Sequence, residues 1–294
     1  IEQVVHPQPT DSVLGIVPHS VSGDRKESNF SPMINIQYQW TSESMAYISW
    51  AQGFKSGGFD ARSNKPVTAP TGFPAGFGGG TFEFEDERAT TYELGVKTAI
   101  GGKAEINADV FFTDYKDLQT SAFDGAIGFT VGNGTAEVRG VELEGRWQAT
   151  SRYRLSGSLA WLDFEWKKYF GQCYFGRTSL ATGPNAGDCD YAGFDNQLSP
   201  KLTGVLSNEY TWALGRSLQL KGTVDVTYSD DYLLSLTLDP QAVQKSFAKV
   251  NARLELGSEE GRWQLALIGR NLTDETTLSY AGDTPLAQRL FGAR

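Results

Sequence analysis

The feature that most constrains this chain is a strict alternation of apolar and polar residues. From Leu218 to Tyr228, every even-numbered position is apolar or glycine and every odd-numbered position is polar. Successive side chains of a β-strand point to opposite faces, so such a strand has one apolar and one polar surface. A helix would scatter the same residues around its circumference. The pattern therefore predicts a β-strand.

The same alternation recurs along the chain and predicts ten strands. The regular runs lie at residues 34–40, 91–97, 104–112, 141–147, 218–228 and 248–256. Less regular runs lie at residues 45–54, 152–168, 200–212 and 262–271. Almost no amphipathic helical pattern separates them, so an antiparallel all-β fold is the most economical interpretation.

The predicted connections are alternately short and long. The short ones lie near 41–44, 100–103, 148–152, 213–217 and 257–261, and the long ones near 55–88, 117–133, 169–198, 229–244 and 272–286. This order places every short turn at one end of the sheet and every long loop at the other. A soluble sandwich mixes loop lengths, whereas an outer-membrane barrel has short periplasmic turns and long outer loops.

Aromatic residues are predicted to collect at both strand ends. One set lies beside the short turns: Trp40, Trp147, Tyr153, Trp212 and Trp263. The other lies toward the long loops: Trp50, Tyr92, Phe112, Trp161 and Tyr228. Indole and phenol rings favour the two membrane–water boundaries. A general preference of aromatics for strands is the alternative, but it does not explain their concentration at both ends.

The polar face carries charges of both signs, which suits a wide, hydrated lumen rather than a packed interior. Adjacent apolar pairs at Phe111–Phe112 and Trp161–Leu162 break the alternation and suggest bulges or projection beyond the bilayer. The residues predicted to line the lumen are Glu93, Lys97, Glu105, Asp109, Glu142, Glu144, Arg146, Lys221, Asp225, Lys249, Arg253 and Glu255.

Composition narrows the class of partner. The 294 residues carry 26 Lys+Arg against 35 Asp+Glu, a net charge of -9, and no basic stripe that would neutralise the phosphates of a nucleic acid. The longest aliphatic stretch, Leu265–Ile268, is far shorter than the roughly 20 residues of a membrane-spanning helix. Nucleic-acid partners and membrane helices are therefore not expected, but a membrane barrel is.

Several motifs resemble one family, the TonB-dependent outer-membrane receptors, and they occur in that family's order. Residues 46–59 (AYISWAQGFKSGGF) are similar to its "Y-S-x-G-F-K-x-G-G-F" stretch, and residues 91–97 (TYELGVK) to its "S-Y-E-L-G-x-K" strand. Further matches are residues 29–32 (NFSP), 109–119 (DVFFTDYKDLQ), 136–144 (AEVRGVELE) and 269–275 (GRNLTDE).

The resemblance implies an antiparallel transmembrane β-barrel of 22 strands, preceded by a plug domain and a TonB-binding box that this sequence lacks. Ten complete strands and the start of an eleventh, at Ala287–Arg294, would form the C-terminal part of that barrel. We therefore expect an irregular outer-loop segment at 1–30 and barrel wall at 31–294. The last residues, 291–294 (FGAR), do not end in the family's terminal aromatic.

The resemblance also implies a function: energised import of a scarce solute, such as a ferric siderophore or similar iron complex, across the outer membrane of a Gram-negative bacterium. The implied partners are outer-membrane lipid, a small-molecule ligand (a metal chelate) and the TonB complex, reached through the missing N-terminal region. Three alternatives stay open: a passive porin or structural barrel, a receptor for a glycan or cobalamin, and a soluble β-rich binding or carbohydrate-processing protein.

Cys173 and Cys189 lie in the long connection 169–198 and are either free thiols or a disulfide. On an outer-surface loop an oxidising environment favours the disulfide, which would stabilise the loop by roughly 3 kcal/mol. Aromatic residues surround the two cysteines and would suit either ligand capture or packing within the loop. These candidates are Tyr169, Phe170, Tyr174, Phe175, Tyr191 and Phe194.

No catalytic or metal-binding arrangement emerges, so neither enzymatic activity nor a cofactor is expected. The two histidines, His6 and His19, both fall in the first 30 residues and have no neighbouring nucleophile motif. Asp188, Asp190 and Asp195 could bind a hard cation, but their irregular spacing is more typical of a soluble loop.

Overall fold

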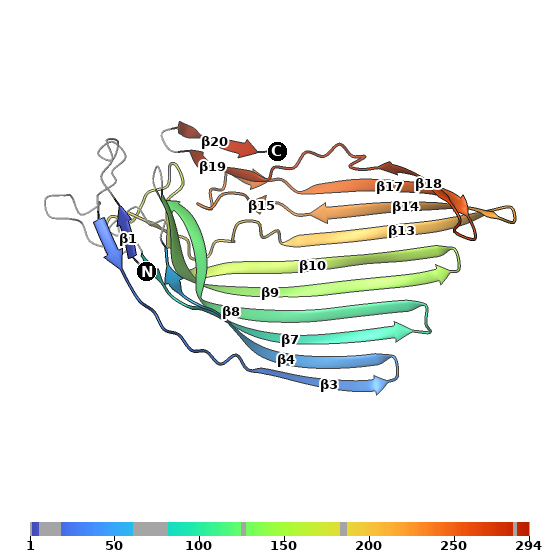
Figure 1. Ribbon diagram of the computed structural model, residues 1–294, viewed down its shortest axis with the longest axis horizontal. Helices are drawn as coiled ribbons and strands as arrows, with labels where there is room; N and C mark the ends of the chain where they lie inside the picture. The colour runs from blue at the N-terminus through green and yellow to red at the C-terminus, as the bar shows by residue number, and fades with distance from the viewer. Residues whose placement is uncertain are drawn as a thin grey trace.

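The computed structural model describes residues 2–5, 19–60, 82–124, 128–182, 187–284 and 287–293. Within these residues the secondary structure is β, and one ten-stranded antiparallel sheet dominates the molecule (Figure 1). No helix in the described part of the chain has the length and hydropathy needed to cross a membrane.

Each strand of the large sheet pairs with its neighbours in chain order, in the sequence β18-β17-β14-β13-β10-β9-β8-β7-β4-β3. The ten predicted strands and the antiparallel all-β fold are confirmed. The strands are β3 (Met33–Thr41), β4 (Ser44–Lys55), β7 (Glu87–Ile100), β8 (Ala104–Asp124), β9 (Gly128–Thr150), β10 (Tyr153–Lys168), β13 (Leu202–Leu214), β14 (Leu218–Ser229), β17 (Phe247–Ser258) and β18 (Gln264–Gly269).

Short two-stranded pairs occur in the connections. They join β1 (Glu2–Val5) to β2 (His19–Ser22), β5 (Gly58–Phe59) to β6 (Glu83–Phe84), β11 (Phe170–Gly171) to β12 (Cys189–Asp190), β15 (Tyr232–Leu233) to β16 (Val243–Gln244), and β19 (Tyr280–Thr284) to β20 (Ala287–Ala293). The segment 1–30, expected to be irregular, thus contains a strand pair. The predicted start of an eleventh barrel strand is a strand, but it pairs with β19 rather than with β18.

Short turns gather at one end of the sheet and long connections at the other, as the alternation predicts (Figure 1). One long connection is corrected. Residues 117–133 are mostly paired, because β8 and β9 resume their ladder at Leu118↔Gly134 after a register shift and continue to Asp124↔Gly128. Asp117 lies at that shift and adopts a φ of 55°. The alternation of apolar and polar residues stops there, but the β8–β9 hairpin continues beyond it.

The apolar positions form one continuous surface of the sheet. The register aligns Ile48 with Leu94, Leu94 with Val110, and Val110 with Val141, so apolar side chains follow one another across β4, β7, β8 and β9. This surface is exposed rather than folded into a dry core, and Leu94 and Leu267 are 52% and 74% exposed. The apolar face is therefore available to a nonaqueous surrounding.

The adjacent apolar pairs do not mark bulges, contrary to one of the two interpretations from sequence. The β8–β9 register is unbroken at Phe111 and Phe112, and the β9–β10 register is unbroken at Trp161 and Leu162. In each pair one side chain therefore faces the apolar side and the other the polar side. The register shifts lie further along, between Tyr115 and Leu118 and between Trp166 and Lys168.

Candidate functional site

All twelve residues predicted to line the lumen share the polar face of the sheet, because the register places them at alternate positions of paired strands. Several are fixed by neighbours on that face. Arg146 pairs with Glu105 at 2.7 Å between Nη2 and Oε1, and Ser207 donates to Asp225 at 2.6 Å. The Lys249 ammonium donates to Thr277 Oγ1 at 2.9 Å, which links the sheet to a loop.

Contacts on the polar face explain why the strand motif at 91–97 contains Gly95. The Tyr47 hydroxyl donates to Glu93, and the Lys97 ammonium lies 5.6 Å from the Tyr47 ring centroid. A Cβ at Gly95 would fall 2.4 Å from that ring, so only glycine leaves room for it. Gly140 is related to Phe111 in the same way, with a Cβ position 2.4 Å from the ring.

Toward the long loops the polar face becomes apolar. In β10 the apolar side chains change from odd positions, ending at Trp161, to the even positions Leu162, Phe164 and Trp166. By register, Phe164 and Trp166 lie opposite Val138 and Ala136 of β9, and all four are buried. The sequence carried this signal as the break in alternation at Trp161–Leu162, for which a bulge and projection beyond the bilayer were the two interpretations.

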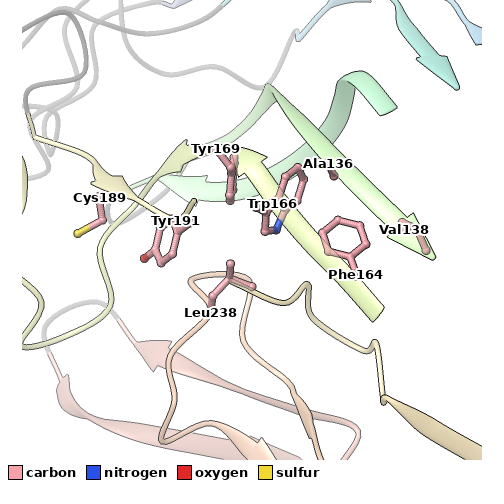
Figure 2. Close-up of a cluster of buried hydrophobic side chains, with 8 residues drawn as sticks. All are labelled: Ala136, Val138, Phe164, Trp166, Tyr169, Cys189, Tyr191 and Leu238. Atoms are coloured by element: carbon pink, nitrogen blue, oxygen red, sulfur yellow. The ribbon is translucent and has the colours of Figure 1, made fainter. Parts of the chain in front are cut away.

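Loop residues cover this apolar patch and complete a buried cluster (Figure 2). Tyr169, Cys189 and Tyr191 come from the connection between β10 and β13, and Leu238 comes from the connection between β15 and β16. The Trp166 and Tyr169 rings stack with centroids 4.5 Å apart. Two long loops therefore fold over the polar face of the sheet at its loop end.

The predicted disulfide between Cys173 and Cys189 is present, with an S–S distance of 2.07 Å. It closes a segment in which the two cysteines are 16 residues apart. Cys189 is part of the buried cluster, so the bond ties Cys173 and the turn that follows it to the packed base of the loop.

The six aromatic candidates divide into buried and accessible groups. Tyr169 and Tyr191 are 4% and 1% exposed, so for these two the packing alternative describes the structure. Tyr174 and Phe194 are half-buried and pack against the cluster, Phe170 is half-buried, and Phe175 is 58% exposed. Contact of these four with a ligand remains a prediction.

Arg177 is a loop residue that the sequence reasoning missed. Its guanidinium carbon lies 4.6 Å from the ring centroids of both Tyr191 and Phe194 and 5.6 Å from that of Tyr174. It also donates to the Asp190 carbonyl. Burial raises the pKa of Tyr191 above its ordinary value, and the adjacent guanidinium offsets only part of that shift.

Phe175 stands at the tip of a tight turn next to this cation. The Arg177 amide donates to the Tyr174 carbonyl at 3.1 Å, and Gly176 takes a φ of +89°. This geometry is typical of a type II turn, whose third position requires glycine. The turn therefore carries an exposed ring, Phe175, two residues before Arg177, on a loop fixed by the disulfide.

A hollow of about 490 Å³ lies between the disulfide loop and the β15–β16 connection. Lys201 borders it and pairs with Asp195 at 3.4 Å and with Asp163 at 3.7 Å. Of the three aspartates considered as cation ligands, only Asp195 lines this hollow. Within the described residues, no group of three or more His, Cys, Asp or Glu side chains is arranged to hold a metal ion.

Arg25 forms a second network that the sequence did not reveal. It pairs with Glu27, with Glu83 at 2.9 Å, with Glu85 at 3.1 Å and with Asp86 at 3.3 Å, and its side chain is 17% exposed. The hydrogen bond to Glu27 is the main cause that raises the pKa of Arg25. The network joins the N-terminal segment to the strand β6 region on the loop side.

On the apolar face, an ion pair marks the level at which polarity returns. Arg139 donates to Asp163 Oδ2 through Nε at 2.8 Å and through Nη2 at 2.7 Å. The two residues are cross-strand partners, two positions beyond Val141 and Trp161 toward the loops.

The sequence model of the family described as "TonB dependent receptor-like, beta-barrel" matches residues 7–272. The chain therefore belongs to this family, as its motifs and its ten-stranded antiparallel sheet indicate.

Solved structures agree on the fold. The ferric yersiniabactin uptake receptor FyuA from Yersinia pestis matches over 94% of this chain and 37% of its own length, with 19% identity and a TM-score of 0.67. The siderophore receptor PiuA from Acinetobacter baumannii matches over 89% and 33%, with 20% identity and a TM-score of 0.60. The ferric-catecholate import receptor Fiu from E. coli K12 matches over 90% and 34%, with 16% identity and a TM-score of 0.57. The chain thus spans about a third of these proteins, and its sheet corresponds to part of a larger barrel.

Proposed function

We propose that this chain forms part of the wall and outer loops of an outer-membrane receptor that imports a scarce metal chelate, most simply a ferric siderophore, with energy supplied through TonB. The observation that carries the proposal is the position of the loop cluster. A disulfide-fixed loop with Phe175 and Arg177 at its surface folds over the end of a charged face. Membership of the family and the siderophore-uptake receptors among its structural neighbours support the same function.

In this function the apolar face meets lipid and the charged face lines the passage. The exposed ring of Phe175 and the guanidinium of Arg177 would contact an aromatic, negatively charged chelate through stacking and charge. The buried pair Tyr169 and Tyr191 would hold the loop in shape instead of touching the solute.

The test is uptake of ⁵⁵Fe-labelled siderophores by cells that carry the complete receptor, its deletion, or a deletion of tonB. Energised import predicts uptake that is lost in both deletions. Uptake that survives loss of TonB would favour the passive-porin alternative. Uptake of copper, cobalamin or a glycan in place of a siderophore would show that the proposed ligand is wrong. The copper transporter OprC is among the structural neighbours, so copper belongs in the panel.

Two variants then locate the solute contact. Phe175→Ala and Arg177→Gln should each weaken uptake at low solute concentration while leaving the amount of folded receptor unchanged. The matched control is Leu267→Ala, which removes a large exposed side chain from the opposite face of the sheet. If uptake is the same in both loop variants as in the control, this loop is not the capture site.

A further inference from the structure

A pocket of about 280 Å³ opens beside the short turns β7–β8 and β9–β10, which lie at the same end of the sheet (Figure 1). We call it the turn-end pocket. Sites for drug-sized molecules typically measure roughly 300–1,000 Å³, so an occupant of this pocket must be small. Its lining is mainly charged or polar, and consists of Lys103, Glu105, Arg146, Gln148 and Arg154 together with Ala99, Gly102 and Ala104.

The strand ladders direct the five charged or polar side chains of the lining to the polar face of the sheet. Gln148 lies opposite Lys103, because the Gln148 amide donates to the Lys103 carbonyl at 2.7 Å, and it also lies opposite Arg154 of β10. The next row, two residues further from the turns, holds Glu105 opposite Arg146. Positions two residues apart on a strand share a face, so the two rows project together.

Hydrogen bonds hold both guanidiniums of the pocket in place. Gln148 Oε1 accepts from Arg154 Nε at 3.0 Å, and Gln148 Nε2 donates to two backbone carbonyls of the turn at 2.7 and 3.3 Å. Arg146 Nη2 donates to Glu105 Oε1 at 2.7 Å. A guanidinium carries five N–H donors, so each of these two keeps donors for a further acceptor.

Cations outnumber carboxylates in and around the pocket. Lys103 forms no ion pair within the part of the chain that the structure describes. Glu209, on the neighbouring strand, is shared between two cations, at 4.0 Å from Arg154 and 3.7 Å from Lys221. The charged residues at this end of the polar face are the cations Lys103, Arg146, Arg152, Arg154 and Lys221 and the carboxylates Glu43, Glu105 and Glu209.

The spacing of the cations suits an anion with more than one acidic group. Lys103 leads into β8 and Arg154 belongs to β10, so their backbones are two strands, or about 10 Å, apart. A molecule with two or three carboxylates can place one group at the guanidiniums and another at the ammonium. Arginine is well suited to the first contact, because its planar fork binds a carboxylate through two parallel hydrogen bonds.

We propose that the turn-end pocket binds a small polycarboxylate, with one carboxylate against Arg146 and Arg154 and another against Lys103. The short turns of an outer-membrane barrel face the periplasm, so in the proposed receptor the pocket receives acidic groups of the chelate where it leaves the lumen. This role in import rests on the proposed function, whereas the binding of a polycarboxylate does not.

Single neutralising substitutions test the pocket from both directions. Lys103→Gln and Arg154→Gln each remove a cation, whereas Glu105→Gln removes the carboxylate of the lining and releases Arg146. All three side chains are exposed, so folding of the barrel does not depend on them. The matched control is Arg262→Gln, which removes an exposed cation from the turn β17–β18, outside the pocket.

The probes are citrate and its uncharged trimethyl ester, titrated into the complete receptor in detergent and followed by calorimetry at low ionic strength, where exposed charges are least screened. We expect one citrate site in the wild type and in Arg262→Gln, and no binding of the ester. Binding of citrate should weaken about fivefold in Lys103→Gln and in Arg154→Gln, the ratio that loss of one exposed ion pair produces. It should tighten in Glu105→Gln, because a repelling charge is gone.

Absence of citrate binding, equal binding in all variants, or weaker binding in Glu105→Gln would each overturn the proposal. Inorganic phosphate that binds as tightly as citrate would overturn the assignment to a polycarboxylate. A receptor that binds citrate in the expected pattern but imports no siderophore would remove the proposed function alone. Siderophore uptake without citrate binding would remove this inference alone.

Discussion

Truncation of Leu238 to alanine should open the loop cluster without unfolding the sheet. Leu238 is 2% exposed, belongs to a connection outside the ten-stranded sheet, and packs with Trp166, Tyr169 and Tyr191. Leucine-to-alanine changes at well-packed sites cost between 2 and 5 kcal/mol, and about 3 kcal/mol is reasonable for a site closed by loops on one side. That loss corresponds to a roughly hundredfold increase in the open population of the cluster.

Hydrogen exchange of two loop amides measures that population directly. The Tyr191 amide donates to the Tyr169 carbonyl at 2.8 Å, and the Gly193 amide donates to the Trp166 carbonyl at 2.7 Å, so both are protected only while the loop is docked. In Leu238→Ala both should exchange about a hundredfold faster, while amides in the centre of β14 keep their protection. Phe175→Ala, which removes an exposed ring from the same loop, is the control. Equal exchange in the two variants would show that Leu238 does not hold the cluster together.

Three further predictions concern the same end of the molecule and the wall below it. Replacing both Cys173 and Cys189 with alanine should lower the stability of the loop by about 3 kcal/mol, measured by exchange of the same amides, because the open loop regains its freedom; unchanged exchange would contradict this. Burial raises the pKa of Tyr191, so the docked loop keeps its stability below the ordinary tyrosine pKa of 10.0 and should lose stability as the pH rises above it. A tyrosinate titration follows this ionisation, and Tyr191→Phe should make the stability of the docked loop less dependent on pH. Gly140→Ala should lower the barrel's unfolding stability by about 1–3 kcal/mol through overpacking, seen as earlier loss of the compact band on semi-native gels, whereas Gly132→Ala, with nothing within 4 Å of the new Cβ, should not.

The wall of the barrel was predictable because alternation is a local property of the sequence. The run from Leu218 to Tyr228 fixes the two faces of β14, and the order of short and long connections fixes which strand ends lie together. Where alternation changed phase, the sequence left a bulge and projection beyond the bilayer open, and the unbroken register contradicts only the bulge. At Trp161–Leu162 a single strand passes from one environment to another, and a bulge would produce the same sequence pattern.

The loop networks were not predictable, because they depend on pairings between distant segments. Arg25 finds its partners Glu83, Glu85 and Asp86 about 60 residues away, and no periodicity relates them. Arg177 is recognisable only once the disulfide and the buried rings place Tyr191 and Phe194 beside it. Side-chain identity suggested the disulfide and the aromatic loop, but three-dimensional packing decided which rings are buried.

In the proposed outer-membrane barrel, the Arg139–Asp163 pair limits how deep the wall can sit. If the barrel sank by one pair of residues, this guanidinium and carboxylate would enter the acyl region, and if it rose by the same amount, Val141 and Trp161 would move out into water. Either displacement is unfavourable, so the vertical position of the wall is fixed to within a residue pair. The stapled loop is attached to the same strand, so in the proposed receptor it would be held at a constant height above the lipid surface.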